Sequence, residues 1–111
     1  MPFTQIILEK KPPIAKITLN RPEALNALSP TLLNELKQAL DDVEQDQQIK
    51  VVVLTGSGRA FCAGADLKFM AQQKELFDYI QMLDEVFFKV ECLDKPVIAA
   101  VNGYALAGGL S

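Results

Sequence analysis

Two loops rich in glycine and alanine hold the residues of this sequence that could do chemistry. Residues 57–67 (SGRAFCAGADL) directly follow the apolar run KVVVLT, and residues 102–109 (NGYALAGG) directly follow PVIAAV. Small residues let a ligand approach the backbone closely, and backbone N–H groups can stabilise negative charge on a ligand oxygen. Open α/β sheets usually bind ligands at the carboxyl ends of their strands, where both loops begin. Taken alone, each loop can equally be a tight turn.

Neither loop has the pattern of a nucleotide-binding loop. A GxGxxG fingerprint that began at Gly56 would need glycine at position 61, where Phe61 stands. A P-loop would need Gly-Lys followed by Ser or Thr, and the chain has no such run. The two loops therefore contain neither of these nucleotide-binding motifs.

The residue types that are missing or rare narrow the chemistry further. The chain has no histidine, which excludes Ser-His-Asp and Cys-His catalysis and the HExxH zinc site within these residues. Cys62 and Cys92 form no CxxC pair, and no activating group lies near Cys62 in the sequence. We therefore expect Cys62 to be a small buried residue rather than a nucleophile, and we expect no metal site.

Composition and charge place the chain among globular proteins that do not bind nucleic acid. Of the 111 residues, half are hydrophobic and 23% are charged, as in an ordinary folded domain. Eleven basic residues against fourteen acidic ones give a net charge of −3, which does not suit a phosphate backbone. No apolar run is long enough to span a membrane, and the first residues lack the pattern of a signal peptide. The sequence predicts a single-domain cytoplasmic protein.

Strand and helix patterns alternate along the chain. Residues 4–9 and 14–20 are predicted strands, and Pro12-Pro13 between them predicts a turn. Residues 50–55 form a continuous β-branched run that is typical of a strand buried on both faces, and residues 96–103 contain another such strand.

Two helices are predicted between the strands. Ser29-Pro30 is a helix start, and apolar residues at spacings of three and four predict a helix over residues 30–45. We expect its polar residues to face solvent, namely Glu35, Lys37, Asp41 and Asp42. The same spacing predicts a helix over residues 74–92. The order β-β-α-β-α-β indicates a layered α/β fold with parallel strands.

Three blocks taken together carry a resemblance to a known family. Residues 19–29 (LNRPEALNALS), 51–67 (VVVLTGSGRAFCAGADL) and 94–109 (DKPVIAAVNGYALAGG) closely resemble the enoyl-CoA hydratase/isomerase (crotonase) family in order and spacing. The resemblance implies a crotonase-like spiral of repeated β-β-α units, assembled as a homo-oligomer, a trimer or a pair of trimers. Family members are about twice this length or more, so residues 1–111 are expected to be the amino-terminal part of a crotonase-like domain.

The resemblance also implies a substrate and a way to activate it. The substrate would be an acyl-CoA thioester, with coenzyme A entering as part of the substrate and no separate cofactor. By motif, the backbone N–H groups of Ala65 and Gly108 would form an oxyanion hole around the thioester carbonyl oxygen. Enolate chemistry builds negative charge on that oxygen, and one such donor contributes about 3–4 kcal/mol in the transition state. The alternative is that both are small turn residues.

Further residues correspond to the family's substrate-binding positions. Arg59 and Lys68 would hold the adenosine and phosphate end of coenzyme A, or they are solvated surface charges. The backbone of Glu23, Ala24 and Ala27 would line the nucleotide and pantetheine path. Tyr104 would border the acyl pocket or simply pack. The remaining expected contacts lie in the first loop, at Ala63, Gly64, Asp66 and Leu67. For Asp66 we favour a helix N-cap over a catalytic acid.

The sequence departs from the hydratase pattern at the catalytic glutamates. Hydratases of the family carry the first one two residues after the glycine pair, where this chain has Ser111, and the second about twenty residues further on. A serine hydroxyl is a much weaker base than a carboxylate. Two hypotheses remain: the chain is part of a longer enzyme that uses other residues, or it is a truncated, inactive CoA-binding or assembly module. Whether it is an enzyme stays open at this point.

Overall fold

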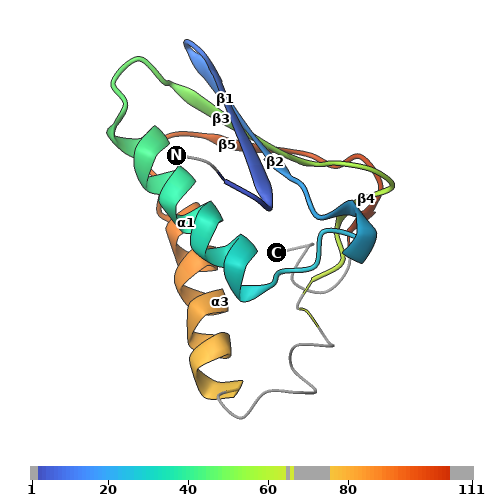
Figure 1. Ribbon diagram of the computed structural model, residues 1–111. Helices are drawn as coiled ribbons and strands as arrows, with labels where there is room; N and C mark the ends of the chain where they lie inside the picture. The colour runs from blue at the N-terminus through green and yellow to red at the C-terminus, as the bar shows by residue number, and fades with distance from the viewer. Residues whose placement is uncertain (1–2, 65, 67–75, 106–111) are drawn as a thin grey trace.

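A four-stranded mixed sheet forms the centre of the computed structural model, which describes residues 3–64, 66 and 76–105. The strands are β1 (Ile6–Lys11), β2 (Ile14–Leu19), β3 (Val51–Gly56) and β5 (Val97–Ala100), in the spatial order β1-β2-β3-β5 (Figure 1). β1 and β2 form an antiparallel hairpin, whereas β2, β3 and β5 run parallel. The predicted α/β order is therefore confirmed, and most strand ends lie within two residues of the predicted ones.

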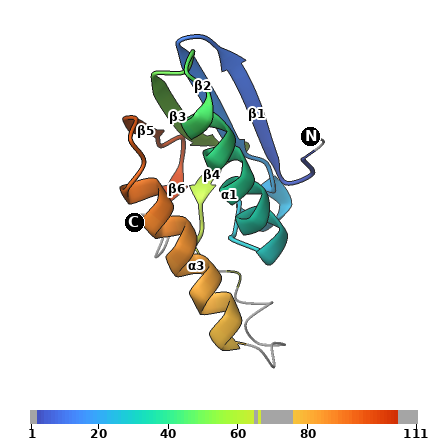
Figure 2. The same ribbon diagram turned by 90° about the vertical axis from the view of Figure 1, so that its left-hand side faces the viewer.

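Both helices lie on the same side of this sheet. α1 (Pro30–Gln45) packs against the sheet, and α3 (Leu76–Glu91) packs against α1 and extends beyond the sheet, as both views show (Figures 1 and 2). The Ser29 side chain accepts a hydrogen bond from the Leu32 N–H at 3.1 Å, which is the expected N-cap of α1. The core lies between helices and sheet and includes Ile17, Leu32, Leu33, Leu40 and Val52, all with no exposed surface or almost none.

The prediction that the parallel strands are buried on both faces is wrong for the described residues. In β3 only Val52 is fully buried, and in β5 Ile98 is 54% exposed. The register explains this, because Val52 faces the helices while Val53 and its partner Ile98 lie on the opposite face, which no described helix covers. A continuous apolar run indicates a strand that could be covered on two sides, but it does not supply the second cover.

The predicted exposure of Glu35 is also wrong. It was expected on the solvent face of its helix, yet it is 9% exposed. Its carboxylate accepts hydrogen bonds from the backbone N–H groups of Thr4 and Gln5 and from the Thr4 hydroxyl, at 2.8 to 3.1 Å. The segment before β1 folds over α1 and buries this side chain, which explains why β1 begins at Ile6 rather than at Thr4.

Three short elements at the carboxyl end of the sheet were not predicted. They are the 3-10 turn η1 (Pro22–Ala24) and the strands β4 (Ala60–Cys62) and β6 (Tyr104–Ala105), which pair in parallel as a second sheet. η1 lies beside β4 at one end of the molecule (Figure 1). Among the described residues, no helix is both long and apolar enough to cross a membrane.

Candidate functional site

Three segments that are far apart in the sequence meet at the carboxyl end of the parallel strands. They are residues 21–29, which contain η1, residues 56–66, which contain β4, and residues 102–105, which contain β6. These segments fall within the three blocks that carry the family resemblance. The fold therefore brings the predicted site segments together.

Asn26 joins the first segment to the second. It is fully buried, and its φ of 57° lies in the left-handed region, which Asn tolerates better than most residues. Its side-chain amide nitrogen donates to the carbonyl oxygens of Ser57, Ala60 and Phe61 at 2.9 to 3.3 Å, while its side-chain oxygen accepts from the Arg21 N–H at 2.7 Å. One buried amide thus fixes the course of both segments.

Asn102 makes the matching connection from the third segment. Its amide nitrogen donates to the carbonyl oxygens of Gly58 and Ala60 at 3.0 and 3.1 Å, and its oxygen accepts from the Gly56 N–H at 3.1 Å. The backbones come so close here that a side chain at Gly103 would place its Cβ 2.0 Å from the Arg59 carbonyl oxygen. This close approach is the reason for glycine at position 103.

Backbone hydrogen bonds join the loop after β4 to residues 25–28, at the end of the RPEALNA segment (residues 21–27). The Ala63 N–H donates to the Leu25 carbonyl at 3.0 Å, and the Leu28 N–H donates to the Gly64 carbonyl at 2.8 Å. Gly64 has a φ of 94°, a conformation that favours glycine. The loop is therefore held against residues 25–28 by its main chain.

Asp66 forms an ion pair with Arg21. The two side chains meet at 2.8 Å, the same Arg21 nitrogen donates to the Ala27 carbonyl at 3.3 Å, and Asp66 is 8% exposed. Whether Asp66 also caps a helix stays a prediction, since residues 67–75 lie outside the described residues. Within the described part of the chain, its carboxylate connects the loop after β4 to the RPEALNA segment.

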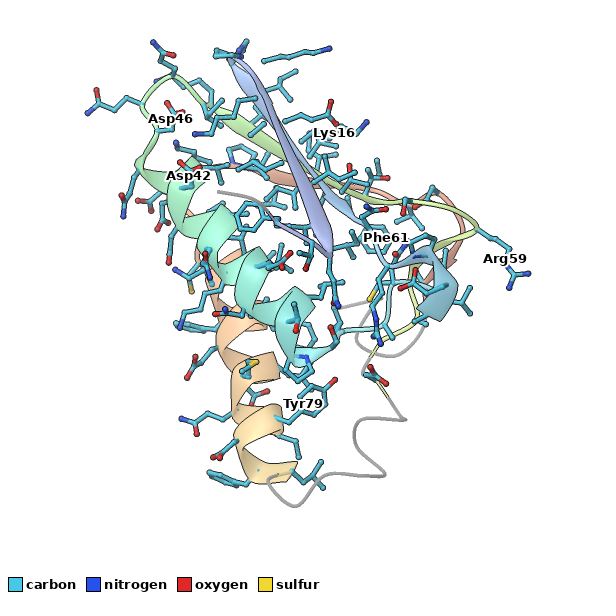
Figure 3. All side chains as sticks on the ribbon, viewed as in Figure 1. Lys16, Asp42, Asp46, Arg59, Phe61 and Tyr79 are labelled. Atoms are coloured by element: carbon cyan, nitrogen blue, oxygen red, sulfur yellow. The ribbon has the colours of Figure 1, made fainter. Side chains whose placement is uncertain are left out.

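Tyr79 reaches the same place from α3. Its side chain is 2% exposed, its hydroxyl oxygen accepts a hydrogen bond from the Asp66 N–H at 2.9 Å, and its hydroxyl donates to the Leu28 carbonyl. Figure 3 shows Tyr79 at the side of the helix that faces the loops. Burial is the main reason that the pKa of Tyr79 is raised above 10.0, so this hydroxyl keeps its proton at neutral pH.

The second sheet sets the relative position of the two glycine-containing loops. In this parallel pair Ala60 lies opposite Tyr104, and Cys62 lies opposite Ala105. Because the strands run in the same direction, both of them end at the same edge of this sheet. Ala65 and Gly108 each come three residues after a member of the Cys62–Ala105 pair, although both lie outside the described residues.

The other predicted site residues are placed as follows. Glu23 is exposed on η1, Ala24 and Ala63 are half-buried, and Ala27 and Gly64 are buried. Arg59 is exposed in the turn between β3 and β4, and its side chain points away from the body of the protein (Figure 3). Leu67, Lys68 and the side chain of Tyr104 lie outside the described part, so their roles stay predictions.

Cys62 is buried in β4, as expected. Burial raises the pKa of its thiol above 9.0, more than the hydrogen bond from the Gly64 N–H to its sulfur at 3.4 Å lowers it. A neutral buried thiol is a poor nucleophile. In the described ranges, no group of three or more Cys, Asp or Glu side chains is arranged to hold a metal ion.

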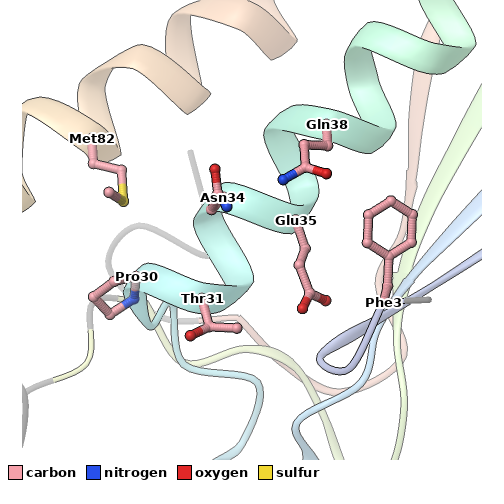
Figure 4. A pocket seen from close by; sticks show the side chains of 7 residues that line it. All are labelled: Phe3, Pro30, Thr31, Asn34, Glu35, Gln38 and Met82. Carbon is pink, nitrogen blue, oxygen red and sulfur yellow. The ribbon is translucent and has the colours of Figure 1, made fainter. Parts of the chain in front are cut away.

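A shallow hollow lies elsewhere, along the outer side of α1. It is lined by Phe3, Pro30, Thr31, Asn34, Glu35, Gln38 and Met82 (Figure 4). None of the predicted site residues lines it, and the one carboxylate at its wall, Glu35, is already bonded to the segment before β1. This hollow is therefore not the candidate site.

Four residues at the site were not predicted as functional. Arg21, Asn26 and Asn102 stand inside the quoted blocks, and for Asn102 the glycine that follows it was the available signal. Tyr79 had no signal of this kind, because it lies in a predicted helix and only the tertiary structure brings its hydroxyl to the loop.

Comparisons with known proteins identify the class to which this fold and site belong. The sequence pattern of the Enoyl-CoA hydratase/isomerase family matches residues 9–111. An enoyl-CoA hydratase structure from Bacillus anthracis superposes with a TM-score of 0.91 at 43% identity, covering 96% of this chain and 43% of that one. An enoyl-CoA hydratase/isomerase structure from Xanthobacter autotrophicus Py2 gives a TM-score of 0.92 at 34% identity, covering 97% and 42%.

The chain belongs to the enoyl-CoA hydratase/isomerase family and has the crotonase fold. A curated relative, the short-chain-enoyl-CoA hydratase of Clostridium acetobutylicum, is 42% identical over 112 residues, which are 98% of this chain and 43% of the relative. The chain thus spans less than half the length of the relatives it matches. It corresponds to their amino-terminal part, as the resemblance implied.

Proposed function

We propose that this chain binds an acyl-CoA thioester and holds its carbonyl oxygen between the backbone N–H groups of Ala65 and Gly108. When water or buffer takes a proton from C2, the electron pair of the broken C–H bond shifts toward that oxygen, and the two donors would stabilise the enolate that forms. The rest of coenzyme A would follow the backbone of Glu23, Ala24 and Ala27. Arg59 and Lys68 would meet its phosphates, where cationic side chains offset the negative charge.

One observation carries this proposal, the parallel pairing of β4 with β6 in the register Cys62–Ala105. It starts the two loops side by side and in the same direction, with each proposed donor three residues beyond the paired residues. Asn26 and Asn102 support this arrangement, because both of them bond to the Ala60 carbonyl in β4.

The proposal is tested with acetoacetyl-CoA, a β-keto thioester whose enolate absorbs in the near ultraviolet. Bound to the 111-residue chain, it is expected to show more enolate at a given pH than it does in buffer. Gly108→Pro and Ala65→Pro each remove one N–H, and we expect each to lower the ratio of enolate to keto form by about 100-fold. Gly108→Ala is the matched control, because it keeps the donor and adds one methyl group.

Circular dichroism must show that all three variants fold. If both proline variants are folded and retain the wild-type enolate absorbance, the two loops form no oxyanion hole and the proposal is wrong. Isothermal titration with coenzyme A alone measures binding of the nucleotide end, independent of the carbonyl.

A second assay separates an enzyme from a binding module. With Ser111 at the position of the first glutamate and no histidine in these residues, we expect no hydration of crotonyl-CoA by the 111-residue chain at the rates of the family. Loss of the enoyl absorbance at ordinary enzymatic rates would show that this chain has its own base. Binding without hydration would favour the CoA-binding module.

A further inference from the structure

We propose that the Tyr79 hydroxyl is a positioning group that sets the backbone of the loop after β4 at Gly64 and Asp66. The consequence for catalysis rests on the proposed function, because these residues stand on either side of the proposed donor Ala65. Tyr79 would touch no substrate atom and would act only through the main chain of the loop.

The hydrogen bonds around Leu28 carry the proposal. Its N–H donates directly to the Gly64 carbonyl at 2.8 Å. Its carbonyl accepts from the Tyr79 hydroxyl, which in turn accepts from the Asp66 N–H at 2.9 Å. Both backbone groups of Leu28 are thus connected to the loop, one directly and one through Tyr79.

These two hydrogen bonds, at the Gly64 carbonyl and the Asp66 N–H, restrain the backbone between them. In a trans peptide the C=O and the following N–H point in opposite directions in one plane, so a bond to the Gly64 carbonyl also orients the next N–H. A second restraint at Asp66 limits rotation from the other side. A backbone donor stabilises an oxyanion only when its direction is fixed before the charge develops, which is what such restraints provide.

A tyrosine suits this role because its hydroxyl both donates and accepts one bond. The side chain is 2% exposed, so loss of the hydroxyl would leave the Leu28 carbonyl and the Asp66 N–H without this partner in a buried place. Its ring is part of the hydrophobic core between α3 and the rest of the molecule, which gives the hydroxyl a rigid support.

The Arg21–Asp66 ion pair is a separate restraint. It holds the Asp66 side chain at 2.8 Å, whereas Tyr79 holds the Asp66 backbone N–H. A phenylalanine at position 79 would therefore leave the ion pair in place and remove the backbone restraint. Tyr79→Phe is thus a specific variant for this inference.

The first measurement needs no ligand. Amide hydrogen exchange is followed in wild type, Tyr79→Phe and Val86→Ala, the last a control that truncates a buried side chain on the same face of α3, two turns further along. In Tyr79→Phe the amides of Asp66 and Leu28 are expected to exchange about tenfold faster, the factor that corresponds to one net hydrogen bond. The amide of Leu40 in α1 should change no more than in Val86→Ala.

The second measurement uses the same three proteins with coenzyme A and with acetoacetyl-CoA. Tyr79→Phe is expected to bind coenzyme A as wild type does, while the ratio of enolate to keto form of bound acetoacetyl-CoA falls about tenfold. Val86→Ala should keep the wild-type ratio, since a general loss of stability does not change the direction of the donors.

The outcomes are separable. If the Asp66 and Leu28 amides exchange in folded Tyr79→Phe as in wild type, Tyr79 does not set the loop and the inference is overturned. If exchange quickens while the enolate ratio stays at the wild-type value, Tyr79 sets the loop but its consequence for catalysis is overturned. If wild type itself shows no binding and no enolate, the proposed function fails, and the exchange data alone still decide whether Tyr79 positions the loop.

Discussion

Asn26 and Asn102 have the same side-chain chemistry in different surroundings. Both donate an amide N–H to carbonyl oxygens of the β3–β4 region, but Asn26 is fully buried and Asn102 is exposed. The cost of a missing hydrogen bond depends on whether water can replace it. The two residues therefore form a matched pair for measuring how burial sets the strength of these connections.

Aspartate at each position replaces the donating nitrogen with a charged oxygen that faces carbonyl oxygens. For Asn26→Asp we expect the free energy of unfolding to fall by about 3 kcal/mol or more, because water cannot reach the repelling oxygens. For Asn102→Asp we expect a loss of about 1 kcal/mol. Urea unfolding followed by circular dichroism measures both, and equal losses would contradict the assigned difference in burial.

The two cysteines should differ in reactivity in the same way. Cys92 is exposed, whereas Cys62 is buried with a thiol pKa raised by that burial. With a chromogenic disulfide reagent at pH 8, the native protein is expected to release one equivalent of thiolate promptly, and the second only as the chain unfolds. Cys92→Ser should abolish the prompt reaction. A prompt reaction that persists in this variant would mean that Cys62 is accessible.

Glu35 makes stability depend on pH. Burial acts most strongly on this carboxyl and raises its pKa, but the hydrogen bonds from Gln5, Thr4 and Ile6 together outweigh burial, so the pKa lies below 4.5. A carboxyl with a lowered folded-state pKa contributes stability above its unfolded pKa and loses that contribution as pH falls through the folded value.

Glu35→Gln tests this sign. The variant is expected to be less stable than wild type at pH 7, and the difference should shrink as pH falls from about 4.5 toward the folded pKa. Urea unfolding at a series of pH values gives the comparison. A difference that stays constant from pH 7 to below the folded pKa would show that the charge of Glu35 is not responsible.

At the scale of single elements, α1 depends on its start. The Ser29 oxygen accepts from the Leu32 N–H at 3.1 Å, and Pro30 occupies the first turn. Ser29→Ala is expected to lower the free energy of unfolding by about 1 kcal/mol. Thr31→Ala, at an exposed position two residues on, is the control and should change stability by less than about 0.5 kcal/mol. Thermal unfolding of both variants gives the comparison, and similar shifts would argue against the cap.

Gly56, the last residue of β3, allows β3 and β4 to approach each other closely. A Cβ at Gly56 would come within 2.5 Å of the Ala60 and Phe61 carbonyl oxygens and 2.8 Å of the Asn26 amide. Only glycine lets β3 end this close to β4 and the RPEALNA segment. The short sheet that starts both glycine-containing loops therefore depends on a residue without a side chain.

At the scale of the whole molecule, α3 carries apolar side chains on two sides. Tyr79 and Val86 face the core, while Phe77 and Phe88 lie eleven residues apart on the same outer stripe and are 78% and 64% exposed. Ile98 on the sheet is also exposed. Apolar surface of this kind is usually covered by a partner or leads to association.

We therefore expect association of the 111-residue chain at high concentration. Light scattering should report a mass above 12.2 kDa that rises with concentration. Replacing Phe77 and Phe88 with lysine should reduce this mass if the α3 stripe contributes. A monodisperse 12.2 kDa monomer of the unmodified chain at high concentration would contradict the prediction.

Some of this structure could be predicted from local patterns. Ser29-Pro30 and the spacing of Leu33, Leu36 and Leu40 defined α1 from Pro30 to Gln45, since caps and helical periodicity act within a few residues. The alternation of strands and helices gave the α/β class. Within the predicted loops 57–67 and 102–109, the described residues 57–64 lie against residues 25–28 and also contact residues 102–105, although the roles of Ala65 and Gly108 stay predictions.

Other features depended on contacts between distant residues and could not be predicted from the sequence. The pattern of α1 placed Glu35 in solvent, but Thr4 and Gln5 cover it from 30 or more residues away. β4 and β6 are too short to show a strand pattern, and their pairing comes from the approach of Asn102 and Gly103 to the β3–β4 turn. No sequence pattern distinguished Tyr79 within its predicted helix. Its hydroxyl has a specific partner because the packing of α3 brings it to Leu28 and Asp66.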